Sequence, residues 1–132
     1  YKSRLLGQSD DHVLHGGGNT SVKSKALNIF GEEDEILYVK GSGWDLKTIE
    51  EAGFSPTRLA ALRKLATLES MSDTEMTREL RAAMSDPGAP SPSVEAILHA
   101  IIPFKYVDHT HADAVVTLCN SAEGEQLVRK MD

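Results

Sequence analysis

The first third of the chain alternates short apolar runs with turn-forming residues, a pattern typical of β-strands. A glycine turn at residues 16–18 leads into a predicted strand near residues 21–23, and further strands are predicted over residues 26–30 and 36–40. The acidic segment 31–35 separates the last two strands. We therefore predict a hairpin turn there and at least one antiparallel pair.

Helical spacing replaces this pattern in the middle of the chain. One face of a predicted helix is formed by Leu59, Leu62, Leu65 and Ala66. Ser72 and Glu75 have the spacing of a capping box, in which each side chain accepts a hydrogen bond from a free backbone N–H. A second helix is therefore predicted from Ser72 to about Met84.

A third helix is predicted from Ser91 to about Ile102, because a capping serine precedes a proline at the first helical position and Pro103 ends the pattern. We expect its buried stripe to consist of Val94, Ile97, Leu98 and Ile101. Residues 106–109 are predicted to form a strand, and residues 112–119 either a strand or a buried helix. Strands interleaved with helices indicate an α/β domain. We expect a three-layer α/β/α sandwich with a mixed, largely antiparallel central sheet, incomplete in this chain.

Composition and charge narrow the function classes. The 132 residues match one domain, and 40% hydrophobic residues suffice for a packed core. A net charge of -6 argues against general binding to nucleic acids or anionic membranes. Cys119 is the single cysteine, so no intrachain disulfide is expected.

Other features of the sequence concern location and completeness. No apolar run approaches the length of a membrane span, and the first residues lack a signal-peptide core, so we expect a cytoplasmic protein. Because the sequence starts without Met and stops within a helical pattern, we expect the amino-terminal part of one domain. No second domain is expected within residues 1–132.

Two features carry candidate metal and acid–base chemistry. In an extended segment, His109 and His111 project from the same face, so both imidazoles can reach one metal ion. A pair of surface or capping histidines is the alternative. Glu95 follows a predicted helix start, where a carboxylate either stabilises the first turn or does chemistry. His99 lies four residues further, on the same side of that helix, where it can contact Glu95.

Two glycine turns are candidate anion sites. Residues 16–19 and 41–43 would each expose backbone N–H groups to an anion, with Lys23, Lys25 and Lys40 nearby in sequence. Ordinary chain geometry is the alternative for each turn. The first turn is neither a dinucleotide fingerprint nor a Walker loop, because the required glycine and Gly-Lys-Ser/Thr positions are missing.

Four segments, taken together and in order, resemble one known family. The segments are GGGNTSVK, YVKGSGWDL, PSVEAILHA and VDHTHADAVV. They closely resemble the class II aldolase/adducin family, and in particular the aldolase portion of bifunctional rhamnulose-phosphate aldolase/short-chain dehydrogenase proteins. The resemblance spans nearly the whole chain.

The resemblance implies a role for eight residues. His109 and His111 would be ligands of zinc or another divalent metal, and Glu95 the catalytic acid/base residue. The positions that match phosphate-binding residues are Gly18, Asn19, Ser42, Gly43 and Ser93. The sequence departs from the fuculose-phosphate aldolases at Val94, where those enzymes have a second serine that binds phosphate. The family's third histidine ligand would lie beyond Asp132.

The reaction implied by the resemblance is zinc-dependent cleavage of a ketose 1-phosphate, of the rhamnulose or fuculose type, to dihydroxyacetone phosphate and an aldehyde. A pentulose-phosphate epimerase and a non-catalytic adducin-like binding module are the alternatives within the family. The expected partners are a sugar phosphate and further copies of the chain in a homo-oligomer, with no nucleic acid or membrane. A short-chain dehydrogenase domain fused to the parent chain is also expected.

Overall fold

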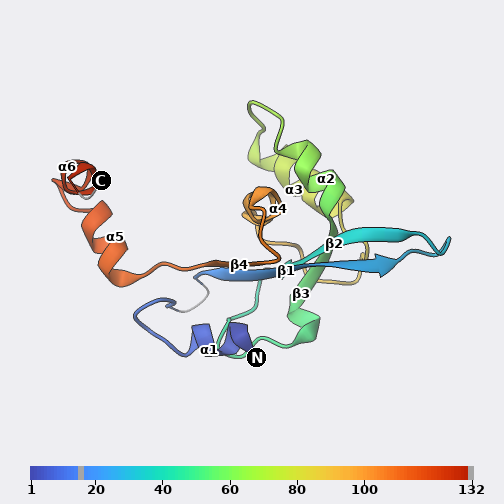
Figure 1. The fold of residues 1–132 in the computed structure, drawn as a ribbon, viewed down its shortest axis with the longest axis horizontal. Helices are drawn as coiled ribbons and strands as arrows, with labels where there is room; N and C mark the ends of the chain where they lie inside the picture. Colours follow the sequence, from blue (N-terminus) through green and yellow to red (C-terminus); the bar gives the residue numbers. More distant parts are fainter. Residues whose placement is uncertain (15–16, 131–132) are drawn as a thin grey trace.

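Four strands form one sheet in the computed structural model, which describes residues 1–14 and 17–130. They are β1 (Asn19–Leu27), β2 (Glu33–Lys40), β3 (Phe54–Arg58) and β4 (Tyr106–His109). Their order is β3-β2-β1-β4, and each of the three pairings between these described strands is antiparallel (Figure 1). Gly16, in the first predicted glycine turn, lies outside the described residues.

β1 and β2 form the predicted hairpin, with two corrections. The strands expected at residues 21–23 and 26–30 are one continuous strand, which ends at Leu27. The turn spans residues 28–32 rather than 31–35, because the Asn28 side-chain oxygen accepts from the N–H groups of Phe30 (2.9 Å) and Glu32 (3.0 Å). Gly31 has a φ of 78°, which few other residues adopt. The acidic residues therefore begin β2.

β3 was not predicted from the sequence. It contains Pro56, which lacks the N–H that a strand paired on both sides requires. A proline is tolerated in β3 because this strand is at the edge of the sheet and β2 is its one neighbouring strand. On its other side β3 makes an isolated bridge between Thr57 and Met84, and the Pro56 carbonyl accepts from the N–H of Ser85. The segment therefore lacks the pattern of a central strand.

Helices α2 (Leu59–Leu65), α3 (Asp73–Ala82) and α4 (Ala96–Ile101) lie together on one face of the sheet (Figure 1). The main core lies between them and β2, and its buried residues are Leu37, Val39, Leu59, Leu62, Leu80, Ala83, Ala96 and Ala100. The capping box is confirmed: the N–H of Glu75 donates to the Ser72 hydroxyl, and the N–H of Ser72 donates to the Glu75 carboxylate.

The other face of the sheet carries α1 (Lys2–Gly7) and the short 3-10 helix η1 (Glu51–Gly53). A second buried cluster lies there, formed by Val13, Leu46 and Ile49. The Ser3 hydroxyl is 2.7 Å from that of Thr20 on β1, which ties α1 to the sheet. Layers therefore lie on both sides of an antiparallel sheet, and the predicted α/β class is confirmed.

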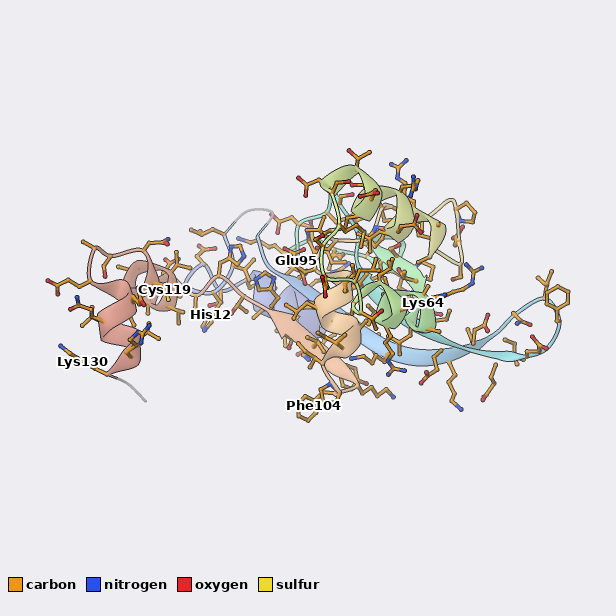
Figure 2. All side chains as sticks on the ribbon, turned by 90° about the horizontal axis from the view of Figure 1, so that it is seen from above. His12, Lys64, Glu95, Phe104, Cys119 and Lys130 are labelled. Carbon is orange, nitrogen blue, oxygen red and sulfur yellow. The ribbon has the colours of Figure 1, made fainter. Side chains whose placement is uncertain are left out.

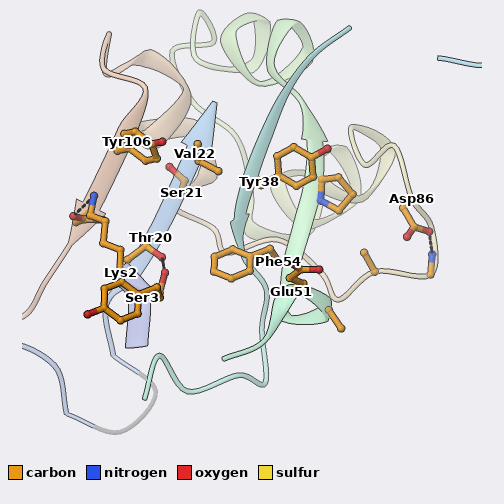
Figure 3. Close-up of a pocket in the computed structure, with 16 residues that line it drawn as sticks. Lys2, Ser3, Thr20, Ser21, Val22, Tyr38, Glu51, Phe54, Asp86 and Tyr106 are labelled. Atoms are coloured by element: carbon orange, nitrogen blue, oxygen red, sulfur yellow. Dashed lines mark hydrogen bonds and ion pairs between the residues drawn. The ribbon is translucent and has the colours of Figure 1, made fainter. Parts of the chain in front are cut away.

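Part of this second face remains uncovered (Figure 3). The strand register places Tyr106, Val22, Tyr38 and Pro56 in one row across all four strands. They line a cavity of about 590 Å³, together with Phe54 and Tyr1. All three tyrosines of the chain therefore lie on this face. Charged residues at its margin include Lys2 and Asp108, which form an ion pair of 2.8 Å.

The third predicted helix begins later than expected. Pro92 forms an isolated β-bridge with Gly41 instead of starting a helix, and α4 begins at Ala96. The expected buried stripe is wrong at three of its four residues: Val94, Leu98 and Ile101 are each at least half exposed, whereas Ile97 is partly buried against the core. The buried residues of α4 are Ala96, His99 and Ala100.

The carboxyl-terminal segment forms α5 (Asp113–Cys119) and α6 (Gly124–Arg129), which lie to one side of the sheet (Figure 1). Of the two readings of residues 112–119, the helix is correct, but α5 contains no buried residue. No helix in the described part of the chain is long and apolar enough to cross a membrane.

Candidate functional site

Asn19 and His109 are direct partners where β1 and β4 meet. The side-chain nitrogen of Asn19 is 3.2 Å from Nδ1 of His109 and 3.4 Å from the Ser93 hydroxyl. Asn19 is only 4% exposed, and its Oδ1 has no hydrogen-bond partner among the described residues. The start of β1 therefore connects the end of β4 with the segment that precedes α4.

His109, the last residue of β4, and His111, two residues later, face each other. Their ring centroids are 4.8 Å apart and the ring planes are inclined by 57°. The backbone N–H of His111 donates to the carbonyl of His12 at 3.0 Å, which holds the segment beside the amino-terminal loop. Within residues 1–14 and 17–130, however, no group of three or more His, Cys, Asp or Glu side chains could hold a metal ion.

Glu95 is the residue immediately before α4 (Figure 2). Burial raises the pKa of the Glu95 carboxyl, but opposing effects outweigh it and leave the pKa below its ordinary value. These effects are, first, hydrogen bonds from the Ser93 hydroxyl and from the N–H of Glu95 itself, and then the nearby charge of His109. The carboxyl is therefore held in its ionised form beside the two-histidine segment.

Three alternate residues of β1 bind α4 along its length. Asn19 contacts the Ser93 hydroxyl before the helix, and Ser21 shares a 2.7 Å hydrogen bond with Nδ1 of His99. Lys23 donates to the carbonyls of Ile102 (2.6 Å) and Phe104 (2.7 Å) after the helix. We call these contacts the β1–α4 seam. The seam fixes where Glu95 lies relative to His109.

His99 is fully buried in this seam. Its Nε2 has no hydrogen-bond partner among the described residues. Burial is the main reason that the pKa of His99 falls to about 4; the charge of His109 lowers it further, while that of Glu95 opposes the shift. His99 is therefore a neutral group, bonded to Ser21 and not to Glu95 as the helical spacing suggested.

Gly18 has a geometry that only glycine permits. Its φ is 68°, and a Cβ on this residue would lie 2.8 Å from the carbonyl oxygen of His109. Any side chain at Gly18 would therefore push the first glycine turn away from β4. The second turn is different: Gly43 has a φ of 84°, but a Cβ there would meet nothing within 4 Å.

Ser42, Gly43 and Ser93 line one cavity of about 440 Å³, which we call the serine cavity. Its remaining lining residues are Lys40, Gly41, Thr77, Leu80, Arg81, Ser91, Pro92 and Val94. Gly18 and Asn19 do not line it, so the two glycine turns do not share this hollow. The link between them is the contact of Asn19 with Ser93.

The three lysines near the glycine turns have different positions. Lys23 belongs to the seam, and Lys25 pairs with Glu33 at 2.8 Å on the exposed part of the hairpin. Lys40 lines the serine cavity and is 7% exposed. Burial lowers the pKa of Lys40, while the charges of Asp45 and Glu95 oppose that shift. Lys40 thus belongs to the candidate site, although its sequence position did not separate it from the other two.

Sequence reasoning also missed the pairing of Ser21 with His99. Nothing in the local sequence shows it, because the residues are 78 positions apart. The alternation of Asn19, Ser21 and Lys23 in a strand is the signal that could have placed all three on one face.

A family model and a solved structure point to the same family. The family described as "Class II Aldolase and Adducin N-terminal domain" matches residues 3–131. The chain is 42% identical over 127 residues to "Uncharacterized oxidoreductase YuxG" from Bacillus subtilis, covering 96% of this chain and 18% of that protein.

A solved structure is also similar. Its title is "Structure of the N-terminal Class II Aldolase domain of a conserved protein from Thermoplasma acidophilum", and the TM-score is 0.90 at 42% identity. The match covers 98% of this chain and 61% of that one. The chain thus spans less than two thirds of both relatives.

Proposed function

The chain belongs to the class II aldolase/adducin family, and on this premise we propose that it is the amino-terminal part of a zinc-dependent aldolase. The substrate would be a ketose 1-phosphate of the rhamnulose or fuculose type, and the products dihydroxyacetone phosphate and an aldehyde. One observation carries the proposal: two facing imidazoles and an ionised carboxylate meet at the end of β4 and the start of α4.

The residues fit part of a catalytic zinc site. His109 and His111 would hold the ion, and a third protein ligand would have to come from outside the described residues, since catalytic zinc typically has three. The buried, unpaired Oδ1 of Asn19 and Nε2 of His99 show polar atoms close by that a bound substrate or water could satisfy. When bound, the ion would supply Lewis-acid stabilisation of negative charge on substrate oxygens.

Glu95 would move the proton in this reaction. The carboxylate is ionised, so it can accept a proton from the substrate hydroxyl during cleavage, and its partial burial opposes the loss of basicity. The same group would return a proton to the dihydroxyacetone phosphate half, which carries the negative charge after the carbon–carbon bond breaks. Ser93 orients the carboxylate by donating its hydroxyl proton.

The phosphate end of the substrate would lie between the first glycine turn and the serine cavity. Gly18 and Asn19 would approach it from β1, and Ser42, Gly43 and Ser93 from the opposite side. The Asn19–Ser93 contact supports this arrangement, because it brings the two groups together across 74 positions of sequence.

The relatives bear on the domain organisation of the parent protein. Because the chain matches only 18% of a protein named as an oxidoreductase, we propose that the parent protein also contains a dehydrogenase domain of the short-chain type. We further propose a cytoplasmic homo-oligomer that binds neither nucleic acid nor membranes.

The proposal is tested on the full-length protein by measuring release of dihydroxyacetone phosphate from ketose 1-phosphates, with metal content determined in parallel. We expect about one metal ion per subunit and loss of turnover on chelation. Glu95→Gln should lower kcat by about 10²–10⁴-fold while the metal stays bound, because general acid–base catalysis typically contributes that much.

A matched pair of histidine variants separates metal binding from protein stability. His111→Ala should lose both metal and activity, whereas His12→Ala should retain both, since the side chain of His12 bonds to Ser9 instead. Full cleavage activity in His111→Ala or in metal-free protein would contradict the aldolase proposal. Stereochemical inversion of a pentulose phosphate without net cleavage would favour the epimerase.

A further inference from the structure

Arg81 of α3 lines the serine cavity together with Ser42, Gly43 and Ser93. Its Nε donates to the Ser91 hydroxyl at 3.1 Å, which restrains the guanidinium group at the cavity. The backbone carbonyl of the same Ser91 accepts from Ser42. Arg81 is thus connected to the second glycine turn through a single residue.

Most other donors of the serine cavity are already engaged. The N–H and the hydroxyl of Ser42 both donate to the carbonyl of Ser91, at 2.8 and 3.1 Å. The N–H of Ser93 donates to the carbonyl of Lys40 at 3.1 Å, and its hydroxyl donates to Glu95. Val94 adds an apolar side chain. An anion in this cavity therefore needs a further donor.

Arg81 has the capacity to be that donor. A guanidinium group carries five N–H bonds, and the bond to Ser91 uses one of them. Arg81 forms no ion pair with any residue in the described ranges. By contrast, Arg78 on the same helix donates through Nε and Nη2 to the Glu79 carboxylate, at 3.1 and 3.0 Å. Lys40, the other cation of the cavity, is influenced by the carboxylates of Asp45 and Glu95.

We propose that Arg81 is the main cationic ligand for the substrate's phosphate group and makes the site prefer phosphorylated over unphosphorylated ketoses. The inference rests on the proposed function, since it assigns a specificity residue to the same site. Its physical basis is that a planar guanidinium can donate two parallel hydrogen bonds to a phosphate, which a lysine cannot do.

The experiment measures binding and turnover in the full-length protein. Inorganic phosphate and dihydroxyacetone phosphate are titrated by calorimetry into the wild type, Arg81→Ala, Arg81→Lys and the matched control Arg78→Ala. We expect Arg81→Ala to weaken both affinities by about 10–100-fold, the range of a lost hydrogen bond to a charged group. Arg81→Lys should bind with intermediate affinity, and Arg78→Ala like the wild type.

Turnover gives a second readout. In Arg81→Ala, KM for a ketose 1-phosphate should rise by about the same factor as the phosphate Kd, with kcat changed less than about threefold, because the residue acts on ground state and transition state alike. The dependence of Kd on salt should also become shallower, since one cationic contact is lost. A purely structural role of Arg81 would leave that dependence unchanged.

The proposal is overturned if Arg81→Ala binds phosphate as tightly as Arg78→Ala, or if the wild type binds neither phosphate nor dihydroxyacetone phosphate at millimolar concentration. Failure of the aldolase assignment has a different signature. Phosphate binding would then depend on Arg81 as described, while no variant, including the wild type, cleaved any ketose phosphate.

Discussion

At the scale of single residues, Asn19 connects the parts of the candidate site. Its amide nitrogen contacts His109 on one side and Ser93 on the other, while its oxygen is buried and unpaired among the described residues. Burying a polar atom without a partner destabilises a protein by about 1–3 kcal/mol. The Asn19 amide, beside the proposed catalytic residues, is therefore suited to bind a ligand, because its nitrogen can donate to a phosphate and its oxygen can accept from a hydroxyl.

Replacing Asn19 tests that idea. Asn19→Ala should raise KM for a phosphorylated ketose by about tenfold or more, because the hydrogen bond that the Asn19 side-chain N–H would donate to the charged phosphate is lost. Zinc content should stay constant, since Asn19 is not a proposed metal ligand. Steady-state kinetics and metal analysis check both points, with the exposed Asn120→Ala as control. A loss of zinc without a change in KM would contradict the assigned role.

His99 supports a prediction about pH. Its pKa is about 4 in the folded chain, against an ordinary value of 6.5, so the unfolded chain binds more protons between these values. The contribution of His99 to stability is therefore fully present above about pH 6.5 and is lost as the pH falls towards 4.

Denaturant unfolding at several pH values measures this effect. The free energy of unfolding of the wild type should fall between pH 6.5 and 4, and that of His99→Gln should fall less over the same window. If the free energies of unfolding of the two proteins fell equally with pH, His99 would not take up a proton on unfolding, and the prediction would be wrong.

At the scale of elements, local sequence signals predicted that a helix exists more reliably than they predicted which of its faces is buried. The capping box at Ser72 and Glu75 specified where α3 starts, because both hydrogen bonds are made within four residues. For α4, the apolar periodicity indicated Val94, Leu98 and Ile101 as buried, yet these are exposed. The small residues Ala96 and Ala100 pack in the core instead. Periodicity finds an apolar face but does not identify the face that touches the sheet.

The capping box provides a stability prediction. Ser72→Ala should lower the free energy of unfolding by about 1 kcal/mol, the usual effect of removing a serine N-cap. Thr74→Ala is the matched control, since the Thr74 side chain is exposed in the first turn of the same helix. Urea unfolding followed by circular dichroism would measure both variants. Equal stabilities of the two would mean that the Ser72 cap is not formed in solution.

At the scale of the whole molecule, the class of the fold was predictable and the assembly of the site only in part. Interleaved strands and helices indicated an α/β domain, and the resemblance named the candidate site residues one by one. That the donors of Ser42 are engaged by Ser91 could not be foreseen, because this contact spans 49 positions. Neither could β3, whose position at the sheet edge depends on tertiary structure.

The composition of the candidate site also leads to a prediction about metal binding by the 132-residue chain alone. The described residues offer two imidazoles and no group of three ligands, so this chain should bind zinc much more weakly than the full-length protein. Competition with a chromophoric chelator would measure both affinities. Equal affinities would show that residues 1–132 contain the complete ligand set.

The β1–α4 seam also limits how α4 can move. Apolar contacts have no preferred direction, so two apolar surfaces can slide past each other with little change in free energy. A hydrogen bond fails within a few tenths of an ångström of its limit, and one step along a strand is about 3.3 Å. Sliding α4 by one such step would break the contacts of Asn19, Ser21 and Lys23 together. These hydrogen bonds therefore allow α4 a single position along β1. Substitutions of the exposed residues Leu98 and Ile101 should leave the position of Glu95 unchanged.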